Sequence, residues 1–269
     1  GQYFAVEREL YRDKTDYQDL VIFENKIFGK VLALDGAIQT TTRDNHPYHE
    51  MLLHVPLLAH GDAKQVLIIG GGDGGSLREA VKHPLERAVM VEIDSEVIDL
   101  SKRYLPELSD GAFDNPKAEV VIADGCRYVA ETTDRFDVIV VDSTDPIGPG
   151  KVLFTSEFYR DCKRCLNPGG ILVTQHGVPL LQADELTDGY RKLSALFDDV
   201  TFYLTVVPTY TGGAMTLGWA TDEPRHRKVP LGKLEERFAG LGIETHYYSP
   251  AVHQGAFALP PDVQRLLTK

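Results

Sequence analysis

The chain has 269 residues, long enough for one large domain with a small satellite domain, and its 43% hydrophobic and 25% charged residues are ordinary for a globular protein. Its formal net charge of −12 argues against general nucleic-acid binding, which needs a basic surface, and is compatible with a cationic substrate. No apolar run approaches the ~20 residues of a membrane span, and no basic segment followed by an apolar stretch opens the chain, so we expect a cytoplasmic protein with no membrane partner.

The first 60 residues predict a small antiparallel β domain. Short β-branched or apolar runs cover Asp19–Phe23, Gly29–Leu34 and Ala37–Thr41. Turn signals at Asn25-Lys26 and Asp35-Gly36 separate these runs. A more helical pattern over His49–Ala59 leads into the second predicted domain, which covers residues 61–269.

From Lys64 onward, apolar strand patterns alternate with helical patterns. The predicted strands are Val66–Ile69, Ala88–Ile93, Glu119–Ala123, Val138–Val141 and Ile171–Thr174. The predicted helices are Ser76–Lys82, Ser95–Leu105, Cys126–Thr132, Ser156–Leu166 and Ala183–Leu196. Near-continuous apolar strands that alternate with helices indicate a parallel sheet covered on both faces.

Two further strands follow, over Val200–Val207 and Ala214–Ala220, and only Pro208–Gly213 separates them. So short a link allows a hairpin but no helical crossover, so we expect the last strand to run antiparallel. Residues 222–269 show a weaker pattern, with a helix predicted over Lys233–Ala239.

A glycine-rich run from Gly70 to Gly75, interrupted only by Asp73, directly follows the first strand of the predicted sheet. Gly70, Gly72 and Gly75 fit the dinucleotide pattern G-x-G-x-x-G, whereas Gly70, Gly72 and Gly74 fit the G-x-G-x-G pattern of adenosylmethionine-type sites. Both patterns use glycine for positive φ angles and for close approach of the backbone to a ligand. A purely structural turn is the alternative, so the run alone is weak evidence.

Acidic residues at the next two strand ends strengthen the nucleotide interpretation. Glu92 ends its strand where a carboxylate can accept both hydrogen bonds of a ribose diol, while capping of the following helix suits Asp94 or Ser95 better. Asp124-Gly125 ends the third strand, where an acid can accept from an adenine amino group and glycine lets the base lie close. These positions predict an adenosine site. The antiparallel last strand and Asp124-Gly125 favour a sulfonium compound over NAD, and with it an α/β fold of the Rossmann-like, methyltransferase type, preceded by the small N-terminal β domain.

A second acidic loop, Asp142–Gly150, follows the fourth strand of the predicted sheet. We expect Asp142 to point into the crevice at the strand ends and Asp145 to hold a cation slightly farther out. Turn aspartates satisfied by backbone amides are the alternative. The prolines and glycines of this segment predict a loop of defined shape.

Two other motifs resemble a metal site and a redox site, but their spacing or context argues against both. His49-Glu50-x-x-x-His54 separates its histidines by five residues, which do not share a helix face, so we predict no metal. Cys162-x-x-Cys165 has redox-motif spacing, but it lies within a predicted helix, and three cysteines do not make a disulfide framework.

Several segments, in matching order and spacing, resemble the polyamine aminopropyltransferases, the family of the spermidine synthases. The matching segments are Tyr17-Gln18-Asp19, Leu34–Gln39, Tyr48–Met51, Leu67–Gly75, Val91–Asp94, Asp142–Pro149 and Pro208–Tyr210. The likeness covers nearly the whole chain and is strongest to the bacterial members that use putrescine.

This resemblance implies a reaction and a role for each matching residue. Decarboxylated S-adenosylmethionine and putrescine would give spermidine, methylthioadenosine and a proton, with no cofactor besides this co-substrate, in a homodimer or homotetramer. The positions that hold methylthioadenosine match Gln18, Glu92, Asp124, Gly125 and Pro149. Asp73 matches the acceptor of the aminopropyl amine, with His49 nearby, and the catalytic positions match Asp142, the proton acceptor, and Tyr48, beside the attacked carbon. Asp145, Gln175 and Tyr210 match positions that line the putrescine channel.

The residues also support this reaction independently. Methyltransferases of this fold usually carry an acid two residues before the first glycine, where this chain has Ile68, and here the acid is Asp73 instead. A carboxylate inside the loop suits a bare ammonium and repels a substrate carboxylate. A methyltransferase and a catalytically silent binding scaffold are the alternatives. Departures from the family pattern leave the range of amines open; they lie at His46-Pro47, at Lys151, which we expect to face solvent, and at His176.

Overall fold

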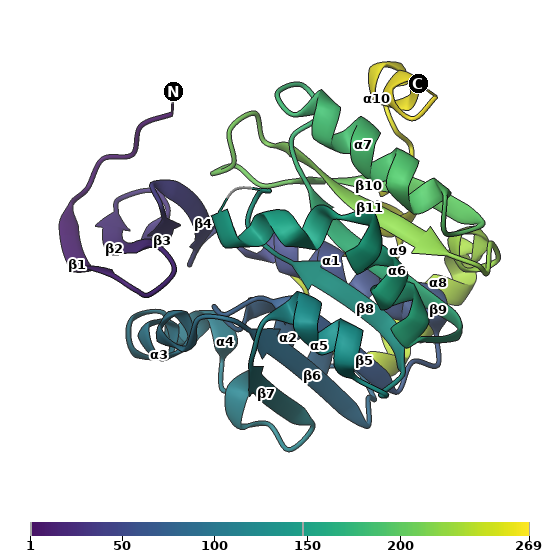
Figure 1. Ribbon diagram of the computed structural model, residues 1–269, viewed down its shortest axis with the longest axis horizontal. Coiled ribbons are helices and arrows are strands. Elements are labelled where there is room, and N and C mark those ends of the chain that lie inside the picture. The colour runs from purple at the N-terminus through teal and green to yellow at the C-terminus, as the bar shows by residue number, and fades with distance from the viewer. Residues whose placement is uncertain (1, 147, 269) are drawn as a thin grey trace.

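The computed structural model describes residues 2–146 and 148–268, which fold around two sheets (Figure 1). The smaller sheet is antiparallel, in the order β1-β2-β3-β4. Its strands are β1 (Arg8–Lys14), β2 (Asp19–Asn25), β3 (Gly29–Leu34) and β4 (Ala37–Thr41). The predicted antiparallel sheet is confirmed, but β1 was not predicted, because five of its seven residues are charged and its residues stay exposed or half-buried.

The larger sheet has the order β10-β11-β9-β8-β5-β6-β7. Its strands are β5 (Gln65–Gly70), β6 (Arg87–Glu92), β7 (Ala118–Ile122), β8 (Phe136–Asp142), β9 (Leu166–His176), β10 (Asp199–Val206) and β11 (Ala214–Thr221). β11 runs antiparallel to both of its neighbours, β9 and β10, as predicted for the last strand. The α/β fold class is therefore confirmed, with β11 inserted between two strands that precede it in the chain.

Helices connect the strands of the larger sheet and close the chain. The α-helices are α1 (His46–His60), α2 (Gly75–Val81), α3 (Ser95–Tyr104), α4 (Pro106–Ser109), α5 (Gly125–Glu131), α6 (Ser156–Cys165), α7 (Ala183–Ser194), α8 (Leu231–Leu241), α9 (Pro250–Ala256) and α10 (Pro261–Leu266). The 3₁₀ helices are η1 (Ala112–Asp114), η2 (Gly148–Phe154) and η3 (His226–Lys228). None of the described helices is long and apolar enough to span a membrane.

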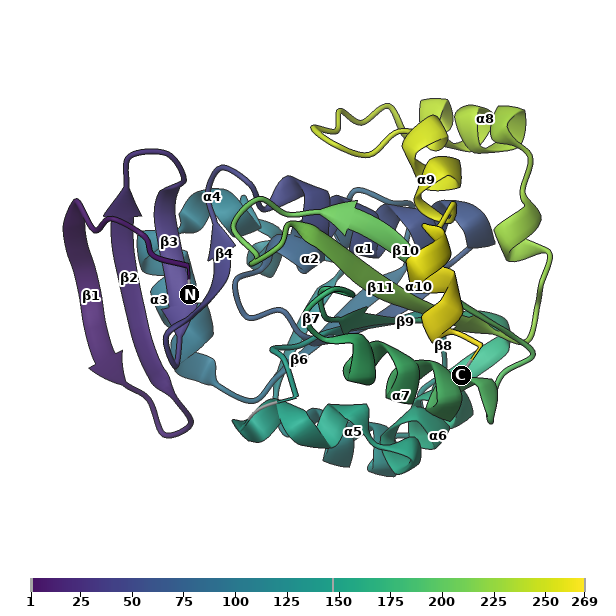
Figure 2. The ribbon, with the colours of Figure 1, turned by 90° about the horizontal axis from the view of Figure 1, so that it is seen from above.

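The core lies in two layers, one on each face of the larger sheet. Alternate residues of β5 show the division, since Val66 and Ile68 join the cluster beneath α1, α2 and α8, while Leu67 and Ile69 join the cluster beneath α5, α6 and α7. Figure 2 shows α5, α6 and α7 on one side of this sheet and α1 and α2 on the other. Strands buried on both faces explain the near-continuous apolar runs of the sequence.

The smaller sheet packs beside the carboxyl edge of the larger one. Leu20, Ile22, Leu32 and Leu34 form a buried cluster with residues of α3 and α4. The strands of the smaller sheet end at Thr41, and α1 packs on the larger sheet. The division of the chain at residue 60 stays a prediction.

Candidate active site

A cavity of about 690 Å³ opens between the smaller sheet and the carboxyl edge of the larger sheet. Every predicted site residue whose side chain the structure describes lines it, together with Gly125; the side chain of Pro149 lies outside the described part of the chain. The predicted residues that line it are Gln18, Tyr48, His49, Asp73, Glu92, Asp124, Gly125, Asp142, Asp145, Gln175 and Tyr210. The fold thus gathers into one space residues that are up to 192 positions apart, from 18 to 210.

The glycine run forms a tight turn at the base of this cavity. Gly70 has a φ of +85°, and a Cβ there would lie 2.1 Å from the carbonyl oxygen of Asp142, so only glycine lets β5 and β8 meet here. A Cβ on Gly75 would lie 2.2 Å from the ring of His49, so Gly75 lets α1 approach the start of α2. The turn therefore brings strand ends and helix starts into contact around Asp73.

Asp73 is buried within this turn and is paired with His49. Its Oδ1 accepts a hydrogen bond from the backbone N–H of Gly75 at 2.8 Å, and its Oδ2 lies 3.4 Å from His49 Nε2. Burial alone would raise the pKa of Asp73, but the His49 imidazole and the Gly75 amide outweigh it and lower the pKa. Burial also opposes protonation of His49, yet the Asp73 carboxylate raises the His49 pKa. The pair therefore favours a negative Asp73, balanced by a positive imidazole.

Asp142 ends β8 next to this turn and receives two neutral donors. Tyr48 on α1 donates to Oδ1 at 2.8 Å, and Ser76 on α2 donates to Oδ2 at 2.6 Å. Burial raises the pKa of Asp142, and the negative charge of Asp73 adds to this, so the proton affinity of the carboxylate is higher than usual. Ser76 was not predicted as a site residue, although a hydroxyl in the first turn after a glycine run was a usable signal.

One side of the cavity is lined by the acids at two strand ends that the sequence predicts to hold a nucleoside. Glu92 Oε1 accepts from the Asp94 amide at 2.9 Å, and burial raises the pKa of Glu92 to about 7. Asp94 caps α3, as the sequence suggested, and also accepts from Gln18 Nε2 at 3.2 Å. Asp124 caps α5 through one carboxylate oxygen, beside the buried Gly125.

The other side of the cavity carries Asp145 in a cradle of amides. Gln175 on β9 donates to Oδ1 at 3.0 Å, and Gln182 donates to Oδ2 at 3.1 Å. Tyr210 closes this side, where its hydroxyl donates to the carbonyl oxygen of Gln39 at 2.7 Å. Gln182 was not predicted, because nothing in its sequence context distinguishes it from an exposed helix-start residue.

The positions that depart from the family pattern do not line this cavity. His46 stacks on His246, with ring centroids 4.0 Å apart, and Pro47 accepts a hydrogen bond from Thr205. Lys151 is exposed, as expected. His176 is fully buried against Phe202.

The two motifs set aside in the sequence have separate structural partners. Glu50 accepts from the backbone amides of residues 246–248, and His54 Nε2 lies 2.9 Å from Glu79, so neither side chain faces the His49–Asp73 pair. Cys162 and Cys165 are buried free thiols on α6.

Comparisons with known proteins give one consistent result. The sequence model of the spermine/spermidine synthase domain matches residues 45–229, and that of the spermidine synthase tetramerisation domain matches residues 1–42. A polyamine aminopropyltransferase of Yersinia pseudotuberculosis serotype O:1b is 56% identical over 269 residues, which is all of this chain and 91% of that relative. A crystal structure of a spermidine synthase in complex with the transition state analogue AdoDATO superposes with a TM-score of 0.93 at 40% identity, covering 98% of this chain and 90% of that one. The spermidine synthase of Thermotoga maritima follows with a TM-score of 0.89 at 38% identity, covering 98% and 89%.

Proposed function

Because the chain belongs to the spermine/spermidine synthase family and is an aminopropyltransferase, we propose that it transfers the aminopropyl group of decarboxylated S-adenosylmethionine to putrescine. The products are spermidine and methylthioadenosine. The observation that carries this proposal is that two carboxylates, the buried Asp73 and the half-buried Asp142, line one cavity together with Gln18, Glu92 and Asp124.

Asp73 is proposed to bind the ammonium of the aminopropyl group. In the free protein its partner is His49, a weak cation that an incoming ammonium can replace. Position 68, where methyltransferases of this fold place an acid, is a fully buried isoleucine in the core. The geometry therefore suits a donor that ends in an ammonium and disfavours intact S-adenosylmethionine, whose carboxylate would meet the charge of Asp73.

The nucleoside half of the donor is proposed to lie against Glu92, Asp124 and Gly125. Glu92 offers a carboxylate to the ribose hydroxyls, and Asp124 retains one oxygen that does not cap α5. A Cβ on Gly125 would lie 2.5 Å from Ile69, so glycine lets the start of α5 pack closely against β5 beside the proposed base site. Gln18 and Pro149 complete the proposed set.

The nucleophile must lose a proton as it attacks. An alkyl ammonium with a pKa of ~10.4 is protonated at neutral pH, and freeing its lone pair at pH ~7.4 costs about 4 kcal/mol. Asp142 is proposed to accept this proton while the C–N bond forms, because its raised pKa makes it a better base than an exposed aspartate. Each of its oxygens already accepts one neutral hydroxyl, from Tyr48 or Ser76, and retains a lone pair for the amine.

The displacement needs no further activation. The amine nitrogen attacks the carbon attached to sulfur, the C–S bond breaks with its electron pair on sulfur, and the sulfonium becomes a neutral thioether. The proton released from nitrogen goes to Asp142. Alignment of nitrogen, carbon and sulfur in one cavity then supplies much of the rate. Asp145, held by Gln175 and facing the side closed by Tyr210, is proposed to bind the distal ammonium of the diamine.

The test is turnover with a panel of amines. The purified chain is incubated with decarboxylated S-adenosylmethionine and with putrescine, cadaverine or spermidine, and both products are identified by mass spectrometry. We expect methylthioadenosine and spermidine with putrescine as the best acceptor. Absence of methylthioadenosine with every amine would refute the proposal, and faster reaction with another amine would replace putrescine by that amine.

We further propose that copies of this chain assemble through the smaller sheet, as a dimer or a tetramer. The support is the match of residues 1–42, which hold the four strands of this sheet, to the spermidine synthase tetramerisation domain. Light scattering on the purified protein decides the number of copies. The cytoplasmic location stays a prediction, which cell fractionation tests.

A further inference from the structure

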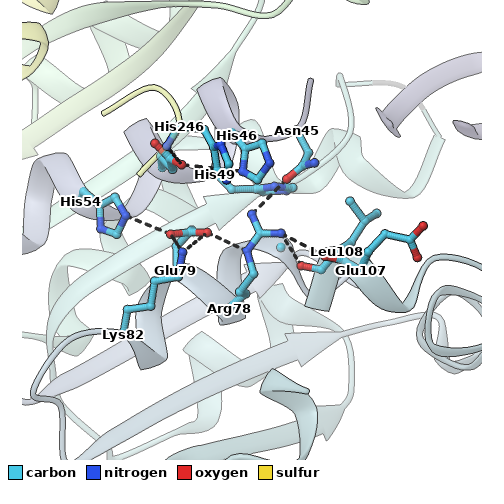
Figure 3. Close-up of polar contacts among 12 residues, drawn as sticks. Asn45, His46, His49, His54, Arg78, Glu79, Lys82, Glu107, Leu108 and His246 are labelled. Carbon is cyan, nitrogen blue, oxygen red and sulfur yellow. Dashed lines mark hydrogen bonds and ion pairs between the residues drawn. The ribbon is translucent and has the colours of Figure 1, made fainter. Parts of the chain in front are cut away.

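A buried cluster of charged side chains lies behind the cavity, between α1 and α2 (Figure 3). Glu79 is fully buried at its centre, with His54 Nε2 2.9 Å away, Arg78 Nε 2.7 Å away and Lys82 Nζ 2.7 Å away. Burial would raise the pKa of Glu79, but the contact with His54 and the charges of Arg78 and Lys82 lower it. None of these four residues lines the cavity, so the chemistry proposed above leaves them without a role.

Arg78 connects this cluster to the segment in front of α1. While Nε donates to Glu79, one terminal nitrogen donates to the side-chain oxygen of Asn45 at 3.0 Å and the other to the carbonyl oxygen of Leu108 at 2.7 Å. Asn45 precedes α1 but makes no side-chain hydrogen bond to cap it. Its amide nitrogen instead donates to the carbonyl oxygen of Thr41 at 3.1 Å. Arg78 thereby fixes the point at which α1 begins.

The start of α1 is also where the proposed catalytic contacts begin. Tyr48 and His49 lie in the first turn of α1 and contact Asp142 and Asp73. The start of α2 touches the same two carboxylates, through the Gly75 amide and the Ser76 hydroxyl. The starts of α1 and α2 must therefore keep a fixed relative position if Asp73 and Asp142 are both to keep these contacts.

We propose that Arg78 is a positioning residue for aminopropyl transfer, an inference that rests on the proposed function. Arg78 sets the start of α1 against α2. It thereby aligns Tyr48 with Asp142 and His49 with Asp73. The planar guanidinium reaches three acceptors on three segments at once, Glu79 on α2, Leu108 on α4 and Asn45 before α1. A lysine has no such fork and cannot span all three. The charge of Glu79 offsets that of the buried arginine.

The experiment compares Arg78→Lys, Asn45→Ala and Asn45→Asp with the wild-type enzyme. Arg78→Lys keeps the charge but loses the fork, and Asn45→Ala removes only the acceptor at α1. Asn45→Asp retains an oxygen for Arg78 and loses the amide bond to Thr41. Lys82→Gln is the matched control, because Lys82 binds the same Glu79 carboxylate without contacting the start of α1.

Three quantities are measured for each protein. They are kcat at saturating decarboxylated S-adenosylmethionine and putrescine, KM for the sulfonium, and Kd for methylthioadenosine. We expect kcat to fall about tenfold or more in Arg78→Lys and Asn45→Ala, because small misplacements of reacting groups are costly. Kd for methylthioadenosine should stay within twofold, since the nucleoside side belongs to β6, β7 and α5. Asn45→Asp and Lys82→Gln should keep kcat within about twofold of the wild type.

Each contrary outcome has one meaning. Unchanged kcat in both Arg78→Lys and Asn45→Ala overturns the proposal, as does a parallel loss of kcat and methylthioadenosine affinity, which indicates general structural damage. If Arg78→Lys does not fold, kcat and Kd of Asn45→Ala and Asn45→Asp decide the question. An equal loss of kcat in both variants would mean that the hydrogen bond from Asn45 to Thr41, rather than the one from Arg78, is what matters, and would overturn the proposal. Failure of wild-type turnover contradicts the proposed function and this inference with it, whereas normal wild-type turnover with unaffected variants contradicts only the role of Arg78.

Discussion

Asp73 lies in the turn after β5 and Asp142 at the end of the neighbouring β8, and their pKa values shift in opposite directions. Asp73 faces an imidazole and a backbone amide, which lower its pKa against the effect of burial. Asp142 faces two hydroxyls, which carry no charge, and burial raises its pKa. Desolvation raises the pKa at both sites. At Asp73 the direct contact with His49 outweighs desolvation, whereas at Asp142 the charge of His49 and the two hydroxyls only reduce the rise.

This difference suits two different tasks. A carboxylate with a lowered pKa stays ionised and binds a cation without taking its proton. A carboxylate with a raised pKa is a better acceptor for the proton that the amine releases. Two hydroxyl donors hold this carboxylate in place. The environments of the two aspartates thus match the proposed division between cation binding at Asp73 and proton transfer at Asp142.

Replacing Asp142 by asparagine tests the proton-accepting half of this comparison and should have the largest effect. The asparagine side chain would keep the shape of the aspartate but would accept no proton, so we expect kcat to fall about 1,000-fold. Kd for methylthioadenosine, which has no amine to transfer, should change less than about twofold. Turnover above one tenth of the wild-type value would show that another group takes the proton. Asp145→Asn is the control, which should raise KM for putrescine more than it lowers kcat.

Replacing Asp73 by asparagine tests the cation-binding half. The amide oxygen can still accept from the Gly75 amide, but the charge is lost, so KM for decarboxylated S-adenosylmethionine should rise about 100-fold. Intact S-adenosylmethionine should at the same time become a better inhibitor, because its carboxylate no longer meets a negative side chain. Steady-state kinetics with both sulfonium compounds measures this, and unchanged discrimination between them would contradict the role of Asp73.

Removing the hydroxyl of Tyr48 should enlarge the difference in pKa between Asp142 and Asp73. Its hydrogen bond to Asp142 stabilises the ionised form and lowers the pKa of Asp142, so Tyr48→Phe should raise that pKa further. The amine can give its proton only to the ionised carboxylate, so activity lost on acidification should be lost at higher pH in the variant. At a pH below the Asp142 midpoints of both proteins, the rate of the variant should therefore be lower than that of the wild type. A pH–rate profile that does not move would remove Tyr48 from this role, and Tyr210→Phe, which leaves Asp142 untouched, is the control.

The sequence predicted the fold well where burial controls residue type. Strands buried on both faces require apolar residues almost throughout, so β5, β6 and β8 were found within about one or two residues of their ends. β1 was missed because its polar residues pack little and are held mainly by pairing with β2. The hairpin link predicted the direction of β11, but its place between β9 and β10 depends on tertiary packing that a short link does not encode.

The candidate site was predicted as far as it lies in strand-end motifs. Asp73, Glu92, Asp124 and Asp142 follow strands, where the carboxyl edge of a sheet gathers them, and the structure brings them to one cavity. Ser76 and Gln182 act through contacts with residues 66 and 37 positions away, which no local pattern specifies. Arg78 shows the same limit, since two of its acceptors, Asn45 and Leu108, lie 33 and 30 positions away.

Glu92 extends the comparison to a third carboxylate and gives the smallest expected effect. It has amide hydrogen-bond donors but no cation beside it, and its pKa is raised to about 7, the direction seen at Asp142. A ribose diol donates to the ionised carboxylate, so methylthioadenosine should bind more weakly as Glu92 is protonated. With a pKa of about 7 in the free protein, Kd should be about tenfold higher at pH 6 than at pH 8. Calorimetry across this range measures the change, and Glu92→Gln, which cannot titrate, should bind more weakly and abolish the slope. A Kd that is constant from pH 6 to pH 8 in the wild type would mean that Glu92 is ionised throughout, and that its amide donors stabilise its charge as effectively as a cation does at Asp73.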